Sequence, residues 1–219
     1  MNELVFKEEI IENWIKILLI ITTFLIMVVR LIIGEKFQFL IKFWNIHRYF
    51  IYKSGSSIPI FTSTNFLMLI LRIIVFSIFL SIYLFPYKFS AFQFSNYLII
   101  SGILSLYIVL KYFIEQTISI IFNFKSLLNE MNRFRIGLKN LISLHFYFYL
   151  IILIFNPISN KITITLSFIL YFIYIFFSSD FIFKKFSNNN LKDLVYFILY
   201  LCTFEIAPAT IVMLQGFKY

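Results

Sequence analysis

Apolar and polar positions form long blocks along the chain, unlike the short periods of a water-soluble domain. An α-helix needs about 20 apolar residues to cross the roughly 30 Å hydrocarbon core of a bilayer. Six stretches approach or exceed this length: residues 14–33, 65–85, 97–122, 141–155, 162–178 and 194–214. The pattern predicts one membrane domain over residues 1–219, an all-α polytopic helix bundle with six transmembrane helices.

Residues 37–52 show a different period. Four polar residues recur at every third or fourth position among aromatic and aliphatic ones: Gln38, Lys42, Asn45 and Arg48. This spacing is typical of an amphipathic helix, and Trp44 with its flanking lysines suits the headgroup layer. We predict an interfacial helix lying on the membrane, with a docking helix for a partner as the alternative.

The composition agrees with a membrane location. Hydrophobic residues make up 61% of the chain and charged residues 13%, and the mean hydropathy is +0.92. No polar stretch is long enough to form a domain, which excludes a water-soluble enzyme with a membrane tail. The single cysteine, Cys202, excludes a disulfide framework and a CxxC metal site.

The positive charge is distributed unevenly between the two sides of the predicted bundle. The segments after the first, third and fifth spans carry eleven basic residues: Lys36, Lys42, Arg48, Lys53, Lys125, Arg133, Arg135, Lys139, Lys184, Lys185 and Lys192. The opposite segments carry four: Lys7, Lys88, Lys161 and Lys218. The positive-inside rule therefore predicts cytoplasmic basic loops and periplasmic termini. The net charge of +9 is explained by the lipid bilayer as partner, and no nucleic acid is expected.

Three ionisable residues, Lys111, Glu115 and Glu205, lie deep in the third and sixth predicted spans. A charge at the centre of a membrane helix costs about 2.5–3.5 kcal/mol, so each residue needs a partner or a neutral form. Lys111 and Glu115 are spaced for an ion pair on one helical face. We also predict that Glu205 contacts Lys111 or Glu115. A polar clamp between helices and a proton or substrate relay both remain open.

The sixth span concentrates unusual residues. Cys202, Glu205 and Ala209 share one face, and Pro208 takes the helical donor away from the Phe204 carbonyl, which predicts a kink. The kink serves either a functional segment or packing alone. We therefore name Lys111, Glu115, Cys202, Glu205 and Pro208 as candidate functional or helix-clamp residues.

Metal and catalytic chemistry have no matching pattern. His145 lies alone in the fourth span, and a histidine of this kind is more often a hydrogen-bonded core residue than a ligand. Arg72, in the second span, is near enough to the cytoplasmic end to extend its guanidinium there. The main intramembrane and nucleotide-driven enzyme motifs do not occur. We expect no catalytic residues, no metal and no cofactor.

The run from Leu199 to Pro208, Leu-Tyr-Leu-Cys-Thr-Phe-Glu-Ile-Ala-Pro, resembles the closing signature of a family of Bacteroidota inner-membrane proteins, a domain of unknown function. Lys111-Tyr112 and Arg135-Ile136-Gly137 are similar to that family to a lesser degree. The resemblance implies a bacterial inner membrane and a constrained sixth span, and it implies no reaction.

These observations favour a non-enzymatic integral subunit or assembly factor of an envelope complex. Short loops leave surfaces for helix packing, so we expect a membrane-protein partner or a second copy of the chain. The alternative is a small transporter or proton-coupled channel that uses Lys111, Glu115 and Glu205.

Overall fold

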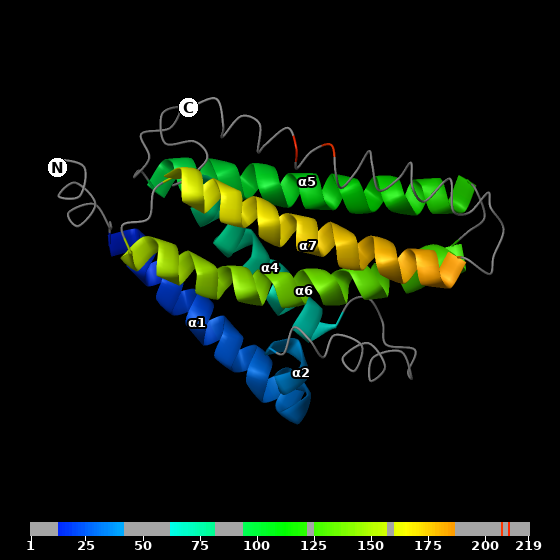
Figure 1. Cartoon of the computed structure of the whole chain (residues 1–219), viewed down its shortest axis with the longest axis horizontal. Coiled ribbons are helices and arrows are strands. Elements are labelled where there is room, and N and C mark those ends of the chain that lie inside the picture. The colour runs from blue at the N-terminus through cyan, green and yellow to red at the C-terminus, as the bar shows by residue number, and fades with distance from the viewer. Residues whose placement is uncertain are drawn as a thin grey trace.

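The computed structural model describes residues 13–41, 62–81, 94–121, 125–156 and 160–186, together with Ala207 and Thr210. These residues are almost entirely helical and include no β-strand (Figure 1). The elements are α1 (Asn13–Ile33), the 3-10 helix η2 (Gly34–Lys36), α2 (Phe37–Ile41), α4 (Ser63–Phe79), α5 (Phe94–Ile121), α6 (Lys125–Phe155) and α7 (Asn160–Phe186). The all-α prediction is confirmed for this part of the chain.

Helix α4 lies at the centre of the described bundle, in contact with α1, α5 and α6. The Thr62 hydroxyl caps its first turn by accepting a hydrogen bond from the Asn65 backbone N–H at 3.2 Å. One stripe of side chains is no more than 1% exposed: Met68, Leu71, Val75 and Ile78. Their spacing of three and four residues is that of one helix face, so this stripe forms the core.

Helix α6 is the most enclosed of the long apolar helices. Half of the residues in its most apolar stretch are buried, whereas 22% of those in the corresponding stretch of α1 and 11% of those in α5 are buried. It contacts α4, α5 and α7, and Leu138, Leu141, Leu150 and Leu153 are fully buried along it. Figure 1 shows α7 beside α6, while α1 starts near one end of α6, runs obliquely away from it and carries α2 at its far end.

Among the residues that the structure describes, three helices are long and apolar enough to cross a bilayer: Asn13–Ile33, Phe94–Ile121 and Arg135–Phe155. These helices coincide with the first, third and fourth predicted spans and support a membrane protein. The second and fifth predicted spans coincide with shorter apolar helices, Ser63–Phe79 and Thr165–Phe177. The sixth, residues 194–214, lies outside the described residues except for Ala207 and Thr210.

Two helices extend beyond the spans predicted within them. Helix α6 begins at Lys125, before the predicted span of residues 141–155, and α7 continues to Phe186, past the predicted span of residues 162–178. The sequence places residues 125–140 in a basic loop because they lie between two apolar stretches and carry four basic residues. A helix that extends beyond lipid needs apolar residues only on the face it buries, so low hydropathy did not exclude helix there.

The predicted interfacial helix over residues 37–52 is represented by α2, Phe37–Ile41. Residues 42–61 lie outside the described part. The corner before α2 forms at Gly34, whose φ of +64° is in the left-handed region and ends α1.

The first turns of α1 and α5 lie at the same end of the bundle. The Trp14 ring is centred 5.9 Å from that of Phe94 and 5.4 Å from that of Tyr97. These aromatic residues begin two helices of spanning length, as in the aromatic belts of membrane proteins. With α4 packed between α1 and α5, the contacts fit helices that alternate in direction along the chain.

Candidate functional site

A buried charge cluster joins α5 to α6. Arg135 Nη2 donates a hydrogen bond to Glu115 Oε1 at 2.7 Å, and Lys111 Nζ lies 4.0 Å from the same oxygen. The Glu115 and Arg135 side chains are each 4% exposed, and that of Lys111 is 12% exposed. The expected ion pair between Lys111 and Glu115 is therefore present, with Arg135 as the nearer cation.

The topology explains how this cluster forms. Helix α5 ends at Ile121, helix α6 begins at Lys125, and residues 122–124 separate them. Glu115 lies near the C-terminal end of α5, and Arg135 lies in the N-terminal part of α6. Because the two helices pack against each other after a short connection, residues on either side of it come together.

The position of Arg135 also relates the cluster to the apolar stretch of α6. The apolar stretch of α6 that could span a bilayer is Arg135–Phe155, so Arg135 is its first residue. The Glu115–Arg135 pair accordingly lies where the apolar part of α6 begins. A charge costs less near the membrane boundary than at the centre, so a pair at this position would be less costly, and the expected depth of Glu115 in the bilayer stays a prediction.

A second polar network joins α4 to α6. Arg72 Nη2 donates to Asn140 Oδ1 at 2.9 Å, and Asn140 Nδ2 donates to Asn65 Oδ1 at 3.2 Å. Asn140 is 2% exposed, so its amide has little access to solvent. Arg72, which the sequence places near the cytoplasmic end of its span, thus contacts a neighbouring helix. Both networks fasten α6 to the helices around it.

Helix α1 is linked to α6 by a third polar contact. The Tyr147 hydroxyl lies 2.6 Å from Thr23 Oγ1 and 3.3 Å from the Leu19 carbonyl oxygen. Tyr147 is 3% exposed. A hydroxyl buried among apolar helices requires such a partner, and the contact joins residues more than a hundred positions apart.

The apolar pattern does not single out Arg135, Asn140, Asn65 or Tyr147 as site residues. It places Arg135 in a loop, and a loop residue has no defined position relative to Glu115. The signal that could have found it is the helical spacing of Leu141 continued backward to Leu138 and Arg135, a regular three-residue step. Asn140 would then have entered the same helix.

His145 lies within hydrogen-bonding distance of its own helix. Its Nδ1 is 2.8 Å from the Leu141 carbonyl oxygen, and the residue is half-buried. Within the described ranges, no group of three or more histidine, cysteine or acidic residues could hold a metal ion.

Cys202, Glu205 and Pro208 lie outside the described residues, so the predicted contact of Glu205 with Lys111 or Glu115 stays a prediction. The two described residues of that segment, Ala207 and Thr210, are both helical. Thr210 Oγ1 donates to the Ala207 carbonyl at 2.9 Å.

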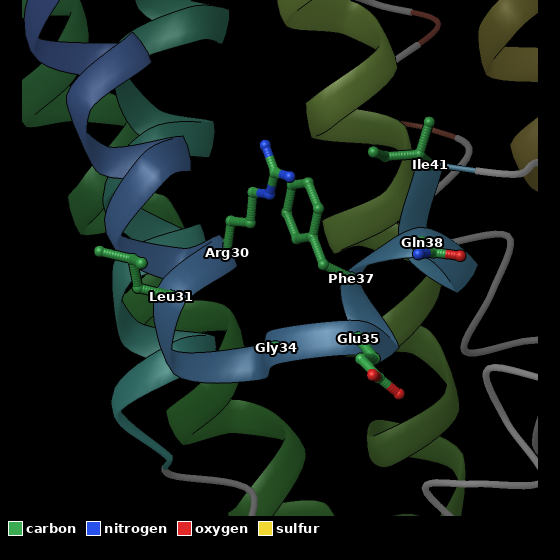
Figure 2. A pocket seen from close by; sticks show the side chains of 7 residues that line it. All are labelled: Arg30, Leu31, Gly34, Glu35, Phe37, Gln38 and Ile41. Atoms are coloured by element: carbon green, nitrogen blue, oxygen red, sulfur yellow. The ribbon is translucent and has the colours of Figure 1, made fainter.

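A hollow of about 460 Å³ lies apart from these networks, at the turn between α1 and α2 (Figure 2). Its lining residues come from the end of α1, the 3-10 turn and α2: Arg30, Leu31, Gly34, Glu35, Phe37, Gln38 and Ile41. Lys111, Glu115 and Arg135 do not line it.

Comparison with known proteins gives a family and no described activity. Residues 15–214 match the family described as "Domain of unknown function (DUF4271)". Neither the curated proteins nor the solved structures gave a match. The matched residues include every helix described here except part of the first turn of α1, and they include the charge cluster and the sixth apolar stretch. The chain therefore belongs to the DUF4271 family.

Proposed function

We propose that this protein is a non-enzymatic integral subunit or assembly factor of an envelope complex in a bacterial inner membrane. In this proposal Lys111 and Glu115 act with Arg135 as a clamp between helices. The sixth span, with Cys202, Glu205 and Pro208, packs against a membrane-protein partner or a second copy of the chain.

The observation that carries the proposal is the pairing of Glu115 with Arg135. A 2.7 Å hydrogen bond pairs the two charges inside the protein, where each side chain is 4% exposed. A relay needs a carboxylate that can exchange protons with a water-filled path. The hollow described above is lined by other residues, at the α1–α2 turn. The arrangement at Glu115 therefore favours a structural role.

The proposed orientation has both termini in the periplasm and the three basic segments, which follow the first, third and fifth spans, in the cytoplasm. It is supported by the eleven-to-four distribution of basic residues and by the alternating helices. A bacterial inner membrane is supported by the resemblance of the Leu199 to Pro208 run.

The test combines function and partner identification. We expect a triple variant, Glu115→Leu with Arg135→Met and Lys111→Met, to complement a deletion strain, because apolar residues can replace a buried ionic cluster without loss of stability. Affinity capture of the unaltered protein and the triple variant in mild detergent should then recover the same set of membrane proteins. A triple variant that is folded in the membrane and fails to complement would contradict the clamp.

A transporter or proton-coupled channel is the second candidate, favoured by the cluster of two cations around the buried Glu115 carboxylate. In this case Lys111, Glu115 and Glu205 would carry charge across the bundle. Glu205→Gln would then fold but fail to complement, since an amide cannot titrate. Normal complementation by that variant would exclude a proton relay at Glu205.

A further inference from the structure

We propose that the hollow at the α1–α2 turn binds the headgroup of an anionic phospholipid from the surrounding bilayer. The hollow has a volume of about 460 Å³ and lies at the end of α1, apart from the charge cluster. This volume is within the range of about 300–1,000 Å³ that is typical of small-molecule sites.

The length of α1 places the hollow at headgroup level. Its 21 residues extend about 32 Å at 1.5 Å per residue, close to the roughly 30 Å of the hydrocarbon core. Trp14 lies in its first turn and Arg30 in its last turn. Arg30 is therefore near one membrane surface whichever way the chain is inserted, so the inference does not depend on the proposed orientation.

Arg30 supplies the charge for a phosphate. Its side chain is exposed, and it forms no hydrogen bond or ion pair with any other residue that the structure describes. A guanidinium can donate two parallel hydrogen bonds to a phosphate group. Figure 2 shows the Arg30 and Phe37 side chains pointing toward one another between α1 and α2, with Glu35 pointing away from them. The Glu35 carboxylate therefore points away from the Arg30 guanidinium.

The apolar part of the lining suits the first segment of an acyl chain. Leu31 is 77% exposed and Ile41 is 46% exposed, whereas Phe37 is 6% exposed and forms a fixed wall. The site therefore combines one cation with apolar surface that would otherwise meet lipid. An acyl chain can cover this surface, which free phosphate cannot do.

Gly34 gives the site its shape. Its left-handed backbone ends α1 and redirects the chain into α2, and a Cβ at this position would have no heavy atom within 4 Å. The turn is consequently open on the side of Gly34, where a headgroup can enter.

The test is lipid binding by the purified full chain in detergent, measured by native mass spectrometry with phosphatidylglycerol or phosphatidylcholine. We expect phosphatidylglycerol to be retained preferentially. Arg30→Gln should weaken its retention about tenfold, since one charge-assisted contact is lost. Lys16→Gln is the matched control, because Lys16 is an exposed cation at the other end of α1.

A second variant keeps the test decisive if Arg30→Gln does not fold. Gln38→Glu adds a negative charge to the lining on the exposed side of α2, and it should also reduce phosphatidylglycerol retention. Equal retention of both lipids by the unaltered protein would overturn the proposal. Equal loss in Lys16→Gln and Arg30→Gln would overturn the assignment to Arg30. If inorganic phosphate raises the melting temperature of the protein as much as phosphatidylglycerol does, the assignment of a lipid as the ligand is wrong.

Discussion

At the residue scale, the polar side chains of α6 determine how the described helices are joined. Arg135 reaches α5, Asn140 reaches α4, and Tyr147 reaches α1. In lipid, apolar side chains give helices little reason to prefer each other over acyl chains. Hydrogen bonds and ion pairs of this kind consequently specify which helices are neighbours.

Asn140→Leu should destabilise the protein by about 1–3 kcal/mol, the usual penalty for a lost buried hydrogen-bond partner. The change takes the acceptor from Arg72 and the donor from Asn65. Asn156→Leu is the control, because Asn156 is exposed just after α6 and its side-chain amide donates to the nearby Ile152 carbonyl instead of to another helix that the structure describes. Chemical unfolding in detergent measures the free energy of unfolding of both variants. Equal losses would show that the hydrogen bonds of Asn140 do not contribute to stability.

Tyr147→Phe should cost about 0.6 kcal/mol and at most about 1.7 kcal/mol, as measured for hydrogen bonds between membrane helices. A double-mutant cycle with Thr23→Val isolates the 2.6 Å contact between the two hydroxyls. Additive effects of the two changes would mean that this contact carries no coupling energy.

At the element scale, helix identity followed from the sequence better than helix length. The length of the apolar run at residues 14–33 was enough to predict a membrane-spanning helix there, and α1 occupies Asn13–Ile33. The extension of α6 to Lys125 lacked that signal, because residues outside lipid are free to be polar. The Glu115–Arg135 contact was missed for the same reason, since it depends on the extension being helical.

Gly34→Ala should destabilise the α1–α2 corner by about 1–2 kcal/mol, the cost of a left-handed backbone for a residue with a Cβ. Gly102→Ala is the matched control. Neither Cβ would meet a heavy atom within 4 Å, and Gly102 lies within α5. Alanine there should be neutral or stabilising by up to about 1 kcal/mol. Thermal unfolding in detergent compares them, and a neutral Gly34→Ala would contradict the backbone argument.

At the scale of the whole molecule, the direction of each helix follows from which ends meet. Trp14 and Tyr97 meet at one end, and Glu115 and Arg135 meet after α5 has turned into α6. The sequence predicted this alternation from its apolar blocks alone. It could not predict that α6 would be the enclosed helix and α5 the exposed one, because both are comparably apolar in sequence and only packing distinguishes them.

The orientation is tested by labelling single cysteines with a membrane-impermeant thiol reagent in a Cys202→Ser background. We expect labelling from the periplasmic side at Lys88→Cys and only after permeabilisation at Lys185→Cys, as the basic-residue distribution predicts. The reverse pattern would invert the topology while leaving the helix contacts unchanged.

The length of α6 has a mechanical consequence. Its 31 residues form one unbroken rod, and the portion from Lys125 to Phe134 precedes the stretch that could span a bilayer. A rigid helix transmits displacement from one end to the other. A load on the outer portion would therefore be carried along the helix axis into the buried leucines of the inner portion, and the Arg135–Glu115 contact would pass part of it to α5.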